Sequence, residues 1–144
     1  MRRNRVTLFF LMAFLSFRIY SLEWDEQFSL IGLKLPELFE DFGPPDAVYA
    51  ARGNEVWQDD VVFQYAGKDF FIYKDRVWQV KFSSVFGISL NDPRRAAMLR
   101  LGNTADDNGD YALLPLQGGD WPLMIRVNFT AEFVSAIYVY RSDF

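Results

Sequence analysis

Two segments of the chain share one local pattern: a Gly-x-x-Leu start, a short apolar helix and a glycine at the helix end. The first covers residues 32–43 and the second residues 87–102, and β-type sequence follows each of them. A unit of this kind that occurs twice builds an extended surface from both copies. The pattern therefore predicts a binding surface rather than a catalytic pocket.

Each predicted helix has recognisable ends. In the first, Pro36 suits the first turn and Gly43 suits the left-handed position after the last turn. In the second, Asn91 or Asp92 is the expected N-cap, Pro93 starts the first turn, and the helix is expected to be the longer one. The apolar stripes consist of Leu35, Leu38, Phe39 and Phe42 in the first helix and Ala97, Met98 and Leu101 in the second.

Short runs rich in β-branched and aromatic residues predict the strands. They are residues 46–51, 56–65, 70–73 and 76–82 in the first unit, and 111–116, 123–128 and 133–141 in the second. We expect an α+β fold in which two tandem helix-plus-antiparallel-meander repeats, 22–83 and 84–144, form one curved sheet in a single integrated domain, with the helices on one face. Gly32 aligns with Gly87 and Val80 with Ile137. The alternative is that two glycine-ended helices arose by chance in an unrelated α+β chain.

The N-terminal 21 residues have the pattern of a secretory signal peptide. Arg2, Arg3 and Arg5 precede an apolar run that ends at Phe17, and cleavage is expected after Ser21; an uncleaved anchor is the alternative. This predicts a periplasmic or secreted protein. Removing the segment takes away four of the 15 Lys and Arg and none of the 19 Asp and Glu, so the remainder carries a net charge of −8. That charge disfavours nucleic acid and favours a protein partner with a basic surface.

Cysteine and histidine are both absent from the sequence. Their absence excludes disulfides, thiolate and imidazole catalysis, and metal ligation by cysteine or histidine. We therefore expect no enzyme activity and no cofactor, with a carboxylate-only hydrolase as the remaining catalytic alternative. Residues 104–110 match part of a calcium-loop spacing, but Thr104 and Pro115 stand where carboxylates belong, so a hairpin turn is predicted there instead of a metal site.

The helix ending in Phe42-Gly43-Pro44, followed by an aromatic meander, resembles the BamE (SmpA/OmlA) family of outer-membrane assembly lipoproteins. The residues that carry the resemblance are Gly32, Leu35, Glu37, Leu38, Phe42, Gly43, Pro44, Phe63-Gln64-Tyr65 and the segment 70–82. Tandem duplication of that unit is similar to the secreted β-lactamase inhibitory protein. The resemblance implies protein recognition on a sheet face without a cofactor. The chain lacks the lipobox cysteine of the first family and the cysteines of the second protein.

Alternation along the strands identifies candidate binding residues. It places Val80, Phe82, Ile137 and Val139 under the helices, together with Trp78, Phe133 and Ser135. It directs Val77, Val134 and Ala136 to the opposite face. The predicted partner-binding residues on that opposite face are Gln79, Lys81, Tyr138 and Tyr140, and Trp57 is added as an exposed aromatic.

These observations favour an exported, non-catalytic protein-binding module that resembles an inhibitor. The alternative from a different class is a periplasmic structural or assembly factor of the envelope, in contact with the membrane only through an envelope protein or an uncleaved signal segment. Of the tryptophans, Trp57, Trp78 and Trp121 are each either an interface anchor or a core residue.

Overall fold

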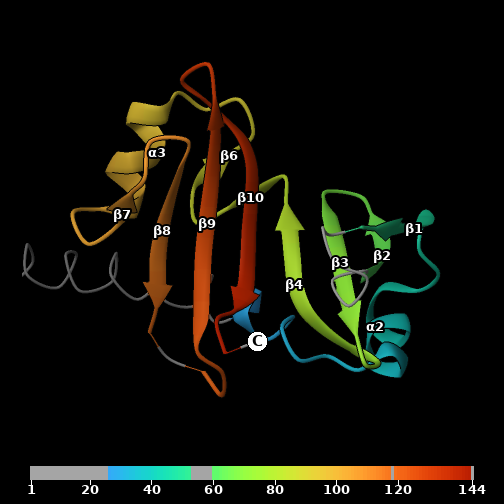
Figure 1. Cartoon of the computed structure of the whole chain (residues 1–144). Coiled ribbons are helices and arrows are strands. Elements are labelled where there is room, and N and C mark those ends of the chain that lie inside the picture. The colour runs from blue at the N-terminus through green and yellow to red at the C-terminus, as the bar shows by residue number, and fades with distance from the viewer. Residues whose placement is uncertain (1–25, 53–59, 118, 144) are drawn as a thin grey trace, which may run out of the picture.

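The computed structural model describes residues 26–52, 60–117 and 119–143, and its element order is helix, four strands, a two-strand hairpin, helix and four strands (Figure 1). The helices that lie wholly within the described residues are α2 (Leu35–Phe42) and α3 (Arg94–Leu101). The strands are β1 (Ala47–Ala51), β2 (Asp60–Tyr65), β3 (Lys68–Tyr73), β4 (Arg76–Phe82), β5 (Ser84–Val85), β6 (Ile88–Ser89), β7 (Asp106–Asp107), β8 (Tyr111–Leu116), β9 (Leu123–Thr130) and β10 (Phe133–Arg141).

Eight of the strands form one antiparallel sheet in the order β1-β2-β3-β4-β10-β9-β8-β7. The first four strands and the last four are each a meander, and the two meanders meet where β4 pairs with β10 (Figure 1). The prediction of a mostly antiparallel sheet with few helices is confirmed. The short strands β5, β6 and β7 were not predicted, because two-residue runs carry no usable alternation.

The two helices end as predicted but do not differ in length. Gly43 and Gly102 have positive φ of 72° and 81°, and each donates its N–H to the carbonyl four residues earlier. Both helices have eight residues, so the expected longer second helix is wrong. Its N-cap is Pro93 and not Asn91 or Asp92, because the Asp92 carboxylate instead accepts the backbone N–H of Ser89.

Gly87 does not take the place that Gly32 has in the first half of the chain. It lies in the β5–β6 turn with φ of 68°, whereas Gly32 precedes α2 and donates its N–H to Val77 at 2.8 Å. The residue with the matching bond is Asn91, which donates to Val134 at 2.9 Å and has φ of 68°. Asparagine tolerates this left-handed conformation, so the residue that matches Gly32 in backbone bonding is Asn91 and not the predicted Gly87.

The turns that enter β4 and β10 also have matching geometry. Lys74 and Asp75 both have positive φ, as do Ala131 and Glu132. In each half, the carbonyl of the second turn residue accepts the N–H of the first residue of the helix: Asp75 accepts from Leu35 and Glu132 accepts from Arg94. The two hairpins are thus held to the two helix starts by equivalent backbone bonds.

Cross-strand register separates two faces of the sheet, because directly paired residues point to the same side. The core face has the row Val48, Phe63, Phe70, Val80, Val139, Ile125 and Leu114. The open face has the row Tyr49, Val62, Phe71, Gln79, Tyr140, Met124 and Pro115.

Helix side chains reach the sheet at residues of the core face. Phe39 and Phe42 of α2 contact the rings of Phe63 and Phe70, with centroid distances of 5.5 and 5.2 Å. Leu38 of α2 and Ala97 and Leu101 of α3 belong to the same buried cluster as the central part of the core row. Full burial of an aliphatic or aromatic side chain contributes about 2 kcal/mol to the free energy of unfolding, so this cluster supplies the main folding energy.

One extra residue in β4 and another in β10 change the predicted faces locally. In β4 the register passes from Phe71↔Gln79 to Ile72↔Val77, so that Trp78 is the extra residue of the strand. Val77 therefore belongs to the buried core, with 1% exposure, and the prediction that placed Trp78 there was wrong. A β-bulge of this kind shifts the alternation by one residue, and sequence periodicity does not reveal it.

The bulge in β10 lies at Ser135. Val134 pairs with the core residue Phe129, whereas Ala136 pairs with Asn128 on the other side. The predicted faces of Val134 and Phe133 were therefore wrong, and Val134 is 1% exposed. The faces predicted for Ile137 and Val139 agree with the register.

The contact between Gly32 and Trp121 gives a stability prediction. A Cβ at Gly32, where φ is 94°, would lie 2.7 Å from Nε1 of Trp121, and the Arg141 guanidinium covers that indole at 3.8 Å from the ring centroid. We expect Gly32→Ala to lower the free energy of unfolding by about 2–4 kcal/mol, from left-handed strain and overpacking together. Urea unfolding followed by tryptophan fluorescence measures the loss.

The matched control is Gly119→Ala. Gly119 has nearly the same φ, 95°, but nothing lies within 4 Å of the position that a Cβ would take there. This variant reports backbone strain without the indole contact, so its loss should be the smaller one by about 1 kcal/mol or more. Equal losses in the two variants would contradict the role assigned to Trp121.

Candidate functional site

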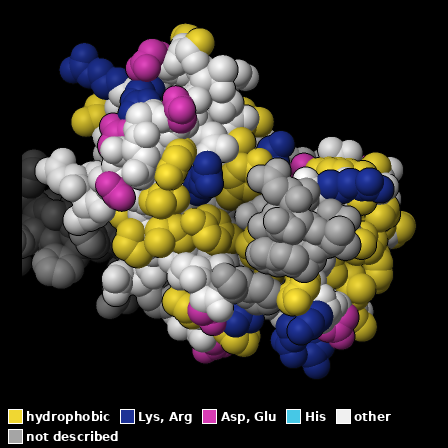
Figure 2. Space-filling model, viewed as in Figure 1, with side chains coloured by type: hydrophobic (Ala, Val, Ile, Leu, Met, Phe, Trp, Pro, Cys, Tyr) yellow, Lys and Arg dark blue, Asp and Glu magenta, His cyan; other side chains and the backbone are white. Residues whose placement is uncertain are grey.

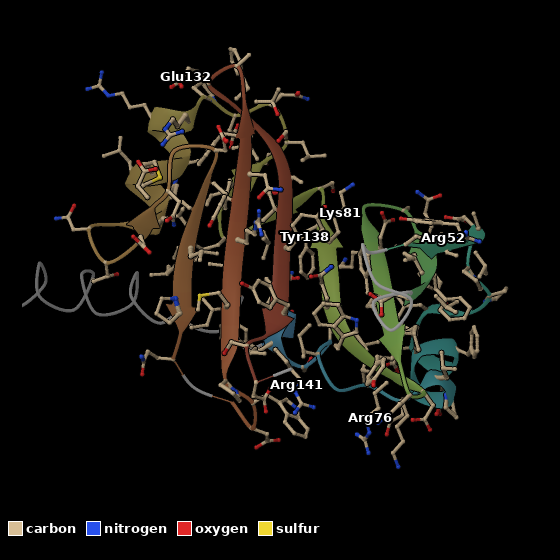
Figure 3. The ribbon with its side chains drawn as sticks, in the orientation of Figure 1. Arg52, Arg76, Lys81, Glu132, Tyr138 and Arg141 are labelled. Carbon is tan, nitrogen blue, oxygen red and sulfur yellow. The ribbon has the colours of Figure 1, made fainter. Side chains whose placement is uncertain are left out.

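Four of the five predicted binding residues lie together on the open face. Tyr138 pairs directly with Lys81, and Tyr140 pairs with Gln79, across the β10–β4 boundary. Figure 3 shows Tyr138 and Lys81 side by side at this boundary. The fifth residue, Trp57, lies outside the described residues. The role of these residues in partner binding stays a prediction.

A hollow of about 450 Å³ lies on the open face over β3, β4, β9 and β10. Tyr138 and Tyr140 line it, and the Phe71 ring stands against Tyr138 at a centroid distance of 6.3 Å. The remaining lining residues are Trp78, Gln79, Arg126 and Asn128. The hollow is thus walled by aromatic rings and lined with side-chain amides and one guanidinium.

The bulge in β4 is what brings Trp78 to this hollow. Its indole N–H donates to the Asp60 carboxylate of β2 at 3.2 Å, which holds the ring along the sheet. Val62, on the same face in β2, is fully buried, in contrast to its neighbour Tyr49, which is 41% exposed. The open face is therefore partly covered toward β2 and accessible around the hollow.

Arg126 is the cation of the hollow and is held on two sides. Its Nε–H donates to the Asn128 side-chain oxygen at 2.8 Å, and its guanidinium carbon lies 4.1 Å from the centroid of the Tyr111 ring. Cation–π stacking of this kind orients a guanidinium as well as attracting it. Figure 2 shows basic atoms set among hydrophobic side chains in front of β8–β10.

Two tyrosines of the open face have raised pKa values. Burial raises the pKa of the Tyr140 hydroxyl, and Arg126 opposes part of that rise. Burial also raises the pKa of the Tyr49 hydroxyl, and the nearby Asp69 carboxylate adds to it. Tyr49 donates its hydroxyl proton to Asp69 at 3.1 Å. Both hydroxyls therefore stay protonated as hydrogen-bond donors at neutral pH.

Phe71, Arg126 and Asn128 were not identified from the sequence as site residues. Phe71 was assigned only to a strand, and Arg126 and Asn128 alternate with buried residues of β9 in the pattern typical of a strand with one solvent-facing side. Alternation identifies their side of the strand. It does not identify β10 as the neighbour that places them beside Tyr138 and Tyr140.

The acidic turn at 104–110 is organised by Arg94 of α3. Arg94 pairs with the Asp107 carboxylate and donates to the Gly109 carbonyl, and its guanidinium also covers the Phe129 ring. The pKa of Asp107 is lowered, first by the Gly109 N–H and then by Arg94. Over the described ranges, no three His, Cys, Asp or Glu side chains are grouped to hold a metal ion.

Neither α2 nor α3, nor any other helix among the residues described, is long and apolar enough to cross a bilayer.

No protein-family model matches the chain, and no curated protein does so either. A solved structure of an extracellular protein containing an SCP domain, from Bacillus anthracis str. Ames, is 12% identical with a TM-score of 0.49. The match covers 81% of this chain and 45% of that chain, so this chain spans less than half the length of that protein. The function is therefore inferred from this chain's own residues.

The Tyr49–Asp69 pair gives a pH prediction. Because the folded-state pKa of Tyr49 is raised above that of the unfolded chain, its contribution to stability is present below pH of about 10 and is lost as the pH rises through the folded value. We expect Asp69→Asn to lower the Tyr49 pKa toward its ordinary value. Ultraviolet absorbance titration of tyrosinate measures this, with Tyr49→Phe identifying the signal. An unchanged Tyr49 titration in Asp69→Asn would contradict the pairing.

Proposed function

We propose that this protein is an exported, non-catalytic binding module that recognises a protein partner through the open face of its sheet, in the manner of an inhibitor. The observation that supports the proposal is the hollow, which two tyrosines, Trp78, Phe71 and Arg126 line together. Tyrosine, tryptophan and arginine are the residues that most often dominate binding energy in protein interfaces.

The chemistry of the hollow suits recognition better than catalysis. None of its described lining residues carries a carboxylate, so these residues offer no acid pair to the carboxylate-only hydrolase alternative. Rigid aromatic side chains with polar groups at their ends provide large contact area at a low cost in conformational entropy. The amides of Gln79 and Asn128 add hydrogen-bonding groups that select a partner's orientation.

We also propose that the fold is a tandem duplication, with both helices bracing one face of a curved sheet. The matched backbone bonds support this. In the first half, residues 32 and 33 bond to residue 77, and residue 35 bonds to residue 75. In the second half, residues 91 and 92 bond to residue 134, and residue 94 bonds to residue 132. The bulges support it too, since Trp78 and Ser135 occupy corresponding places before Val80 and Ile137. The resemblance of the sequence to the BamE family and to the β-lactamase inhibitory protein implies a similar architecture.

Export is proposed from the N-terminal pattern of residues 1–21, which lies outside the described residues. The acidic net charge favours long-range attraction to a basic partner surface. An envelope assembly factor is the second candidate function, and the helix-plus-meander unit similar to BamE favours it.

Cell fractionation separates these two functions. A free binder should be recovered in the soluble periplasm or the medium, whereas an assembly factor should pellet with the envelope and be released by detergent. Immunodetection of the native chain in each fraction is the measurement, and a cytoplasmic location would contradict both.

The two tyrosines give the direct test of the binding proposal. We expect Tyr138→Ala with Tyr140→Ala to abolish partner capture in crosslinking from the native cell, because they remove the central aromatic walls of the hollow. Both rings are partly exposed, so the thermal midpoint should fall only slightly. Mass spectrometry of crosslinked species and thermal unfolding provide the two readouts.

Leu99→Ala is the matched control for loss of an exposed apolar side chain. Leu99 lies on α3, away from the open face, and is 76% exposed. Capture should persist in this variant. Persistence of capture in the double tyrosine variant as well would overturn the proposed function.

A further inference from the structure

The Arg126 guanidinium forms no ion pair with any residue that the structure describes. Its Nε–H bonds to Asn128, but its terminal nitrogens have no acceptor and no carboxylate partner among the residues that the structure describes. The arginines that do form ion pairs there, Arg94 and Arg141, lie against Asp107 and Asp143. A guanidinium carries five N–H donors in a fixed plane, and most of those of Arg126 are left to a ligand.

The orientation of Arg126 is set before any ligand binds. Stacking on Tyr111 fixes the plane of the guanidinium, and the bond to Asn128 fixes its rotation within that plane. A planar fork held in this way matches the two oxygens of a carboxylate. Preorganisation lowers the entropic cost of forming the pair on binding.

The surroundings strengthen an anion's interaction with Arg126. Tyr138 lies beside it in the register, with Lys81 on the other side of Tyr138. The hydroxyl of Tyr140, whose pKa is raised, remains protonated as a further donor at the same hollow. None of the described residues that line the hollow is acidic, so none of them competes for these donors.

We propose that the hollow receives a carboxylate side chain, Asp or Glu, presented by the protein partner, with Arg126 as its ion-pair partner. The inference rests on the proposed function and adds the chemistry of the contacting group. The contact is acidic on the partner's side, although the net charge of this chain is negative. Once the partner covers the hollow, a pair formed beside the Tyr111 ring is less screened than an exposed surface pair.

A peptide-display selection against the immobilised full chain tests this. We expect the selected peptides whose binding depends on Tyr138 and Tyr140 to be enriched in Asp or Glu. Changing that residue to Gln or Asn in the peptide should weaken binding by about 10-fold or more, as expected for a charge-assisted hydrogen bond.

Arg126→Gln completes a double-mutant cycle with the peptide change. Each single change should cost the same factor, and the two together should cost little more than either, because they remove one interaction. Arg95→Gln, an exposed arginine on α3, is the control for loss of one positive charge and should leave affinity unchanged. If Arg126→Gln fails to fold, the peptide change measured on the unaltered chain still decides the matter.

The remaining outcomes contradict either the carboxylate contact alone or both the contact and the proposed function. Peptides that depend on Tyr138 and Tyr140 but tolerate both Arg126→Gln and loss of the carboxylate overturn the carboxylate contact and leave the proposed function intact. Enrichment in Lys or Arg at the hollow also overturns the carboxylate contact. Selection of no peptide, or only of peptides indifferent to all three side chains, overturns both proposals.

Discussion

The pairing of β4 with β10 is the interaction on which the rest of the structure depends. It joins two meanders into one sheet and brings Val80 opposite Val139, both at most 1% exposed, in the centre of the core face. The same register brings Gln79 opposite Tyr140 on the open face. A slip of one residue would bury the tyrosines and expose the valines, so core packing and the composition of the candidate site are specified by the same contact.

The bulges at Trp78 and Ser135 adjust this arrangement without breaking it. Each adds one residue to the strand that forms the central pair, and each returns the preceding valine to the core. In β4 the bulge has a further effect, because it lets Trp78 line the hollow beside Gln79. A strand of strict alternation would bury that indole and leave the hollow with one wall fewer.

The molecule as a whole is negatively charged, whereas its candidate site contains a positive charge, that of Arg126. The chain is acidic overall, yet Asp107 and Asp143 are paired with arginines at exposed positions. The described residues that line the hollow include a guanidinium and no carboxylate. Net charge governs approach over distances up to the Debye length, about 8 Å at physiological salt. Contact chemistry is governed by the few groups in the hollow, so a partner with a basic surface that presents one acidic side chain satisfies both.

By itself the sequence determined the positions of the helices and long strands, since a glycine after an apolar stripe marks a helix end and alternating apolar residues mark a strand. That periodicity also sufficed to direct Gln79, Lys81, Tyr138 and Tyr140 away from the core. Only the tertiary structure decided which strands are neighbours, and hence that Arg126, Asn128 and Phe71 join those residues. It also decided the faces of Val77, Trp78 and Val134, because a bulge against the neighbouring strand leaves no periodic trace in the sequence. The place of Asn91 was decided there too, because its left-handed backbone is bonded to Val134, about 40 residues away.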